Sequence, residues 1–175
     1  MTQIIAEGRH IDLVMRGQWE FARRKGIKGI VGIVPVTDDG RLVLVEQFRP
    51  PVEARVIELP AGLAGDVQGQ ENEPLEAAAH RELLEETGYE AGRLELIFEG
   101  PSSPGLSDER VSFFLAGALR KTGTGGGDES EQIVVHEVML SELEAWLSRK
   151  VGEGLLIDMK VYAALYFACG SSKTH

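Results

Sequence analysis

Short runs in which apolar and polar residues alternate recur along the chain, and these runs predict strands. Residues 11–14 and 19–23 lie on either side of Arg16 and Gly17, a pattern typical of two short strands joined by a turn. Residues 28–37 are rich in isoleucine and valine and predict a buried strand. Further strands are predicted at residues 42–47, 56–59, 94–98, 111–118 and 133–139.

The segment between two of these strands contains Asp38, Asp39 and Gly40. This sequence favours a tight turn, so residues 42–47 are expected to form a hairpin with the strand that precedes them. The run of glycines at residues 123–127 has a different composition and predicts a flexible loop.

Three helices are predicted from residues that favour helix ends. Residues 74–87 predict the first, because Pro74 suits a first turn and Gly88 suits the position after a last turn. The other two are predicted at residues 141–147, where Ser141 and Glu144 match a capping box, and at residues 158–170, where Asp158 is the cap.

The mixed order of strands and helices favours a single α/β domain with a mixed sheet. The length of 175 residues suits one compact domain. We expect residues 1–25 to form a separate antiparallel piece, residues 26–170 to form the main domain, and residues 171–175 to be a flexible tail.

Composition narrows the classes of partner. The formal net charge is −10, which argues against nucleic acid, because phosphate backbones are bound by basic surfaces. No apolar stretch approaches the roughly 20 residues of a membrane-spanning helix, and residues 1–10 lack the pattern of a secretory signal. Cys169 is the only cysteine, which excludes an internal disulfide and suits a reducing cytosol. A cytoplasmic protein is expected.

Acidic residues are concentrated in residues 71–90, where seven glutamates accompany a single arginine, Arg81. Such a run is commonly a solvated helix face. The apolar stripe of the predicted helix consists of Leu75, Ala78, Ala79 and Leu83. At about 100° per residue, Glu82, Glu85 and Glu86 fall on the same side as this stripe. The three carboxylates are therefore expected to point toward the body of the protein.

Three inward carboxylates repel each other, and partial burial strengthens the repulsion. Hard cations would remove it, because Mg²⁺ binds carboxylate oxygens together with water and substrate phosphates. Two alternatives stay open at this point. One is a structural network with Arg81, and the other is a metal-free pair in which one raised pKa provides an acid.

From Glu73 onward the sequence resembles the Nudix box. Glu73 is followed, after seven residues, by Arg-Glu-Leu-Leu-Glu-Glu-Thr-Gly-Tyr at residues 81–89, and this segment fits the family pattern throughout. A match of this length is far more specific than a lone glycine motif. The opening glycine departs from the pattern, because ten residues separate Gly62 from Glu73 where the family has five. We interpret the difference as an insertion in a surface loop.

The resemblance implies an α/β/α sandwich with a mixed β-sheet and a set of metal ligands. It assigns Glu82 and Glu86 as direct ligands of a divalent metal, Glu85 as a further ligand or a partner of metal-bound water, and Arg81 as the residue that orients the carboxylates. In related ADP-ribose pyrophosphatases a backbone carbonyl is another ligand, and it corresponds to Ala61. The implied cofactor is Mg²⁺, with two or more ions per site and Mn²⁺ as a substitute.

Three further segments resemble the ADP-ribose pyrophosphatase branch and imply substrate contacts. In Ser-Pro-Gly-Leu-Ser-Asp-Glu-Arg at residues 103–110, Pro104 and Glu109 match, and the alternative is an ordinary loop. Arg49 corresponds to an arginine that binds substrate phosphate, and a surface salt bridge is its alternative. Trp19 lies in a segment like the N-terminal sheet that this branch exchanges between subunits. Its ring would hold the base, or serve only in core or dimer packing.

The acidic residues that follow the glycine run resemble a mobile loop that supplies the catalytic base in this branch. Glu129 matches the position of the base better, and Glu131 is the second candidate. A loop of this kind can close on bound substrate, order a water molecule and then release the product. An acidic loop without a catalytic role is the alternative.

The resemblance implies Mg²⁺-dependent hydrolysis of a nucleoside diphosphate linked to a sugar, with ADP-ribose converted to AMP and ribose 5-phosphate. It also implies a homodimer that binds a small nucleotide-sugar as its substrate. Neither nucleic acid nor a membrane is expected as a partner. GDP-mannose or ADP-glucose is an alternative substrate, and a Nudix domain that binds its ligand without cleaving it is an alternative function.

Overall fold

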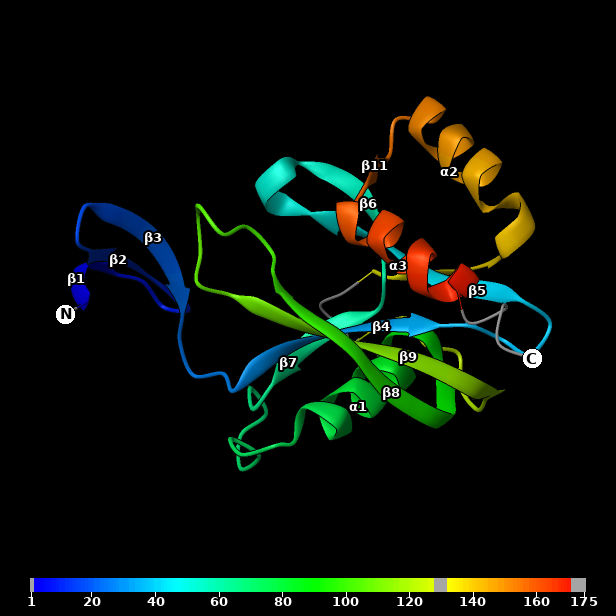
Figure 1. Ribbon diagram of the computed structural model, residues 1–175, viewed down its shortest axis with the longest axis horizontal. Helices are drawn as coiled ribbons and strands as arrows, with labels where there is room; N and C mark the ends of the chain where they lie inside the picture. Colours follow the sequence, from blue (N-terminus) through cyan, green and yellow to red (C-terminus); the bar gives the residue numbers. More distant parts are fainter. Residues whose placement is uncertain (1, 128–131, 171–175) are drawn as a thin grey trace.

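In the computed structural model, which describes residues 2–127 and 132–170, the first three strands form a sheet of their own. These strands are β1 (Thr2–Glu7), β2 (Ile11–Arg16) and β3 (Trp19–Arg24), and neighbouring strands pair antiparallel in that order. Figure 1 shows the sheet standing apart from the rest of the molecule. The separate antiparallel piece expected from the sequence is thus present, with β1 as an additional strand.

The N-terminal sheet meets the body along β3. The N–H of Ala22 donates to the carbonyl of Leu106 at 2.8 Å. Close by, Arg24 Nε donates to Glu109 Oε1 at 2.8 Å. These contacts place the end of β3 beside residues 103–110, the segment that resembles a substrate-binding segment of ADP-ribose pyrophosphatases.

The body contains two four-stranded mixed sheets. One has the order β7-β4-β9-β8 and the other the order β10-β5-β6-β11. Strand β4 runs parallel to β9, and β11 runs parallel to β6, whereas the other neighbours are antiparallel. The bounds are β4 Gly29–Pro35, β5 Arg41–Arg49, β6 Ala54–Glu58, β7 Ala61–Ala64, β8 Tyr89–Pro101, β9 Arg110–Lys121, β10 Val134–Met139 and β11 Leu156–Ile157.

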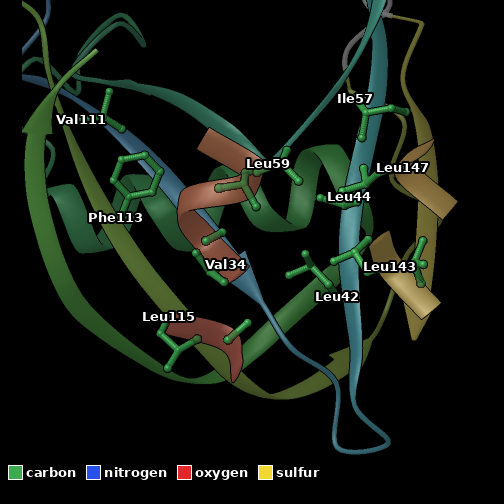
Figure 2. Close-up of a cluster of buried hydrophobic side chains, with 14 residues drawn as sticks. Val34, Leu42, Leu44, Ile57, Leu59, Val111, Phe113, Leu115, Leu143 and Leu147 are labelled. Carbon is green, nitrogen blue, oxygen red and sulfur yellow. The ribbon is translucent and has the colours of Figure 1, made fainter. Parts of the chain in front are cut away.

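The helices are arranged around these sheets (Figure 1). They are α1 (Leu75–Thr87), α2 (Leu143–Gly152) and α3 (Met159–Gly170), with short 3₁₀ turns at Pro50–Val52 and Leu140–Glu142. A core of buried side chains from both sheets also includes α2 and α3, and Figure 2 shows its members converging from these elements. Among the described helices, none is both long and apolar enough to cross a membrane.

A second core holds α1 against the sheet that contains β4. Ala78, Ala79 and Leu83 of α1 are fully buried there with Val31 and Ile33 of β4. Shortening a buried leucine to alanine costs about 2–5 kcal/mol, so this packing fixes α1 firmly. Because β4 is buried throughout its later residues, the expectation of a buried strand is confirmed.

The tight turn expected around Gly40 forms, but the prediction that the two flanking strands pair as a hairpin is wrong. Thr37 and Arg41 share a backbone hydrogen bond of 2.9 Å, and an isolated bridge joins Val36 to Leu42. Beyond this point β4 and β5 separate into different sheets. The turn residues act locally, whereas β4 pairs with β7 and β9 and β5 pairs with β6 and β10.

Of the two expected caps in the C-terminal part, one forms. The helix α2 begins after the 3₁₀ turn Leu140–Glu142 and has no side-chain cap hydrogen bond, so the capping box is wrong. The cap of α3 is confirmed, because Asp158 Oδ1 accepts from the N–H of Lys160 at 2.8 Å. Residues 171–175, the expected tail, lie outside the described residues.

Candidate active site

The helix α1 carries the box glutamates near its C-terminal end. It begins after Pro74, whose backbone is extended, and ends at Gly88, which has a left-handed φ of 74°. The N–H of Gly88 donates to the carbonyl of Leu84 at 2.8 Å. The C-terminal end agrees with the boundary expected from the sequence, and the helix begins one residue later than expected, with Pro74 before its first turn. The arrangement at Gly88 is the usual glycine termination of a helix.

Arg81 lies at the centre of a carboxylate cluster. It binds Glu73 with two hydrogen bonds, of 3.1 Å from Nε and 3.0 Å from Nη2. Its Nη1 donates to Glu82 at 2.9 Å and to Glu85 at 3.1 Å. Its Nη2 also donates to the carbonyl of Leu63 at 2.9 Å. The planar guanidinium thus ties the start of the box, its end and the preceding strand together, which a lysine could not do.

The long loop between Gly62 and Glu73 contributes to the same cluster. Glu73 is buried, and hydrogen bonds from Arg81 lower the pKa of its carboxyl group. The N–H of Gly65 lies 3.5 Å from Glu73 Oε2, and Asp66 lies 3.5 Å from Arg81 Nη2. The additional residues therefore pack against the box and bring one more carboxylate to its edge.

Gly62 leaves room for the carboxylate of Glu82. A Cβ atom at residue 62 would lie 1.8 Å from Glu82 Cδ and 1.9 Å from its Oε1, well inside van der Waals contact. Gly62 pairs with Val31 in the antiparallel pair of β7 and β4, so its backbone has little freedom to move aside. The opening glycine of the motif thus has a steric reason even though its spacing from Glu73 is unusual.

The three box glutamates differ in exposure. Glu86 is almost fully buried, and its Oε2 accepts from the N–H of Ala61 at 3.1 Å. The side chain of Glu82 is 12% exposed, whereas that of Glu85 is 53% exposed. The expectation that all three point inward is therefore wrong for Glu85, which lies at the rim and is held there by Arg81.

Burial raises the pKa of Glu82 to about 7, against the opposing effect of Arg81. A carboxyl group whose pKa is higher in the folded chain than in the unfolded chain binds its proton more tightly when folded. Its contribution to stability is therefore fully present below about pH 4.5, the ordinary value, and is lost as the pH rises through about 7. Without a bound cation, ionised Glu82 destabilises the folded protein at alkaline pH.

We therefore expect Glu82→Gln to raise the melting temperature of the metal-free protein by several degrees at pH 8, and to raise it much less at pH 5.5. The glutamine is neutral at both values, whereas Glu82 is ionised only at the higher one. Thermal unfolding in a chelating buffer measures the difference. Glu85→Gln is the matched control, because Glu85 is half exposed. A gain that is the same at both pH values would contradict this explanation.

The carboxylates line a cleft of about 810 Å³. Among the residues that the structure describes, its charged lining consists of four cations, Arg24, Arg49, Arg81 and Lys160, and six carboxylates, Glu58, Asp66, Glu82, Glu85, Glu86 and Glu109. The backbone of Ala61 and Gly62 forms part of the same wall. The formal charge of the lining is therefore negative despite the four cations.

The predicted residue Arg49 lies in this cleft and pairs with a residue that the sequence did not single out. Arg49 Nε donates to Glu58 Oε2 at 2.7 Å, and Glu58 is buried. Arg24 and Lys160 are also additions to the predicted site. A signal for Glu58 exists, since it is a charged residue at the end of an apolar strand. For Arg24 and Lys160, which come from distant parts of the chain, the sequence offers none.

A second cavity of about 500 Å³ lies next to the cleft and is lined by Trp19 and Phe21 of β3. Pro104 and Glu109, both predicted substrate contacts, also line it. Glu109 lines both cavities, and Arg24 holds its carboxylate. The structure thus brings Trp19, Pro104 and Glu109 together and places them beside the box carboxylates.

The predicted base candidates, Glu129 and Glu131, lie outside the described residues. The glycine run before them is described and forms a loop without helix or strand. The N–H groups of Gly126 and Gly127 donate to carbonyls of α1 at 2.9 and 3.1 Å. Gly127 also lines the cleft.

The chemistry of the donors fits a hard divalent cation. Glu86 offers a buried carboxylate and Glu82 one that is only 12% exposed, and Gly62 leaves the space that the carboxylate of Glu82 occupies. Oxygen-only donors with access to solvent suit Mg²⁺ or Mn²⁺. Within the described residues, no three acidic, histidine or cysteine side chains already converge on one point. In this structure Arg81 occupies oxygens of Glu82 and Glu85 that a cation would share.

Comparison with known proteins gives a consistent result. The model of the NUDIX domain family matches residues 27–154. A solved structure described as an ADP compounds hydrolase superposes with a TM-score of 0.65 at 22% identity, covering 85% of this chain and 80% of that one. At this identity the superposition establishes the fold.

Several relatives of known description are more similar in sequence. The ADP-ribose pyrophosphatase of Bacillus subtilis (strain 168) is 37% identical over 79% of this chain and 76% of its own. The methanol dehydrogenase activator of Bacillus methanolicus is 34% identical over 85% of this chain and 82% of its own. A GDP-mannose pyrophosphatase of Citrobacter koseri is 36% identical over 75% and 68%.

Proposed function

We propose a function for this chain on the premise that it belongs to the NUDIX domain family. It hydrolyses the diphosphate bond of a nucleoside diphosphate linked to a sugar, with ADP-ribose as the preferred substrate. The reaction consumes one water molecule and yields AMP and ribose 5-phosphate. The names of its relatives, which include ADP-ribose and GDP-mannose pyrophosphatases, support this class of substrate.

The observation that carries the proposal is the meeting of two cavities at Glu109. One cavity contains the carboxylates of α1 and is large enough for a diphosphate with its cations. The other is lined by Trp19 and Phe21, whose rings suit a purine base. A substrate with a base at one end and a diphosphate in the middle fits such a pair of cavities.

Electrostatics supports a requirement for divalent cations. The diphosphate of ADP-ribose is anionic at neutral pH, and the cleft itself carries more carboxylates than cations. Bringing the two together without added positive charge is unfavourable, because like charges repel strongly where water is partly excluded. We propose that Mg²⁺, at two or more positions, supplies this charge.

The residues take the following roles in this proposal. Glu82 and Glu86 hold the metal, and Glu85 holds a further ion or an ordered water. Arg81 orients the carboxylates, and it already contacts those of Glu82 and Glu85. When bound, Mg²⁺ neutralises the diphosphate and lowers the pKa of a coordinated water. The carbonyl of Ala61 is proposed as another metal ligand.

The remaining cleft residues bind the substrate. Arg49 contacts the phosphates, and its present partner Glu58 holds its guanidinium ready within the cleft. Trp19 stacks on the base, while Pro104 and Glu109 contact the adjoining sugar. Glu129 is proposed as the base that removes a proton from the attacking water, with Glu131 as the second candidate.

A panel of substrates tests the proposed function. The purified protein is incubated with Mg²⁺ and ADP-ribose, ADP-glucose, GDP-mannose or ATP, and kcat/KM is measured for each. We expect ADP-ribose to give the highest value and ATP the lowest. A higher value for GDP-mannose would identify the alternative substrate, and efficient hydrolysis of ATP would contradict the class. If none is cleaved although ADP-ribose binds, the alternative of a ligand-sensing domain is correct.

We further propose that the N-terminal sheet is exchanged between two subunits, so that the contacts of Ala22 and Arg24 with Leu106 and Glu109, which the single chain makes with itself, form between the subunits of the dimer. Its strands expose a set of large apolar side chains, namely Ile4, Ile5, Ile11, Leu13 and Trp19, all 40% exposed or more in the single chain. Light scattering is expected to give the mass of two chains of 19.1 kDa each. A monomer that is fully active at the working concentration would contradict the exchange.

A further inference from the structure

The glycine run after β9 lies along the C-terminal end of α1. The N–H of Gly126 donates to the carbonyl of Glu86 at 2.9 Å, and the N–H of Gly127 donates to the carbonyl of Glu85 at 3.1 Å. The N–H of Gly123 donates to the carbonyl of Gly88 at 3.1 Å. Carbonyls in the last turn of a helix lack partners within the helix. Here a segment from elsewhere in the chain provides them.

The approach of the two segments leaves no space for side chains. A Cβ atom at Gly125 would lie 2.4 Å from the carbonyl carbon of Thr87 and 2.7 Å from the carbonyl oxygen of Glu86. From the other side, a Cβ atom at Gly88 would lie 2.3 Å from the carbonyl oxygen of Gly123. Gly125 also has a φ of +66°, a conformation that favours glycine. Glycine is therefore required at both contact points.

This contact acts on Glu86, which accepts hydrogen bonds both at its backbone and at its side chain. The backbone carbonyl of Glu86 accepts from Gly126, and its side-chain carboxylate accepts from Ala61. The backbone carbonyl of the neighbouring Glu85 accepts from Gly127. A shift of the last turn of α1 by a fraction of an ångström would therefore move the carboxylate of Glu86 relative to the cleft wall at Ala61.

We propose that Gly125, Gly126 and Gly127 are positioning residues that clamp the last turn of α1 and so set the geometry of the metal-binding carboxylates. The proposal rests on the proposed function for its metal and its substrate. In this proposal the glycines do not touch the reacting atoms, because they act through the backbone of Glu85 and Glu86.

The experiment compares Gly125→Ala with Gly123→Ala. A Cβ atom at Gly123 would meet its nearest atom, in Gly88, at an ordinary 3.7 Å, and its φ is not in the left-handed region. Gly123→Ala therefore changes the same segment without a clash and is the matched control. Mn²⁺ affinity is measured by electron paramagnetic resonance, and kcat and KM are measured with ADP-ribose and Mg²⁺.

We expect Gly125→Ala to weaken Mn²⁺ binding by about tenfold, because changes to the residues that orient metal ligands commonly have an effect of this size. We expect kcat to fall by about 100-fold, since a misplacement of about 1 Å can have this effect, with KM within about threefold. Gly123→Ala should match the wild type in all three measurements. If the role of Gly125 were purely structural, Gly125→Ala would have a lower melting temperature. The Mn²⁺ affinity, kcat and KM of the molecules that remain folded would be unchanged.

The clamp is overturned if Gly125→Ala and Gly123→Ala bind Mn²⁺ and turn over substrate equally well. Failure of the proposed function has a different signature, because the wild type and Gly123→Ala would then both leave ADP-ribose intact. If Gly125→Ala does not fold, hydrogen exchange of the wild type decides. Amide protection of Gly126 and Gly127 above about 100-fold supports the clamp, and unprotected amides overturn it.

Discussion

Replacing Glu86 with glutamine is expected to lower kcat for ADP-ribose about a thousandfold, because removing a metal ligand forfeits several kcal/mol of transition-state stabilisation. The chain should remain folded. The carboxylate of Glu86 accepts a hydrogen bond from Ala61, and the amide oxygen of glutamine can accept the same bond. Glu82→Gln should have an effect of similar size. Steady-state kinetics at saturating Mg²⁺, with circular dichroism as a check of folding, measures both variants.

Glu76→Gln is the matched control for these variants. Glu76 lies in the first turn of α1 and is exposed, so its neutralisation changes the charge of the helix without touching the cleft. It should retain the activity of the wild type. Wild-type rates for both Glu82→Gln and Glu86→Gln would show that neither carboxylate holds a catalytic metal.

Replacing Glu129 with glutamine is expected to lower kcat by about 100-fold to 10,000-fold, the range typical of a general base. Metal affinity and KM should change little, because the lost proton transfer takes place only in the transition state. Glu131→Gln should have a smaller effect. Single-turnover hydrolysis of ADP-ribose by both variants across a titration of Mg²⁺ separates the two roles.

A metal ligand would give a different result in this titration. Its loss would weaken Mg²⁺ binding first, and high Mg²⁺ would restore part of the rate. Recovery of Glu129→Gln at high Mg²⁺ would therefore contradict its assignment as the base. A lower rate for Glu131→Gln than for Glu129→Gln would transfer the assignment to Glu131.

The helix α1 could be predicted closely because its signals are local. Pro74 and Gly88 mark its ends, and the spacing of Ala78, Ala79 and Leu83 fixes the buried face. The same periodicity placed Glu82 and Glu86 toward the body, as the structure shows. It could not separate Glu85 from them, because residues at the edge of a helical stripe are buried or exposed according to what packs nearby.

Strand pairing was harder to predict because it depends on distant segments. The turn at Gly40 suggested that β4 and β5 pair with each other, but a turn fixes only the two residues on either side of it. In the structure β4 lies between β7 and β9, and β5 lies between β6 and β10. Strong strand-forming sequences on both sides of a turn do not reveal which sheet each will join.

The contacts of the glycine run could not be predicted from its composition. Glycines favour flexibility in isolation, and residues 123–127 therefore suggested a mobile loop. In the structure they provide close backbone approach, because Gly125 packs where any side chain would clash with α1. Similarly, Arg24 becomes part of the cleft only because the N-terminal sheet docks on the segment around Glu109. Neither contact can be inferred from local sequence.

Hydrolysis of ADP-ribose with and without Mg²⁺ tests the central claim most directly. The wild-type protein is incubated with the substrate in Mg²⁺ or in excess chelator, and the products are separated and quantified. The proposed chemistry at Glu82 and Glu86 predicts AMP and ribose 5-phosphate in equal amounts in Mg²⁺ and intact substrate in chelator. Equal rates in both conditions, or release of ADP and free ribose, would contradict it.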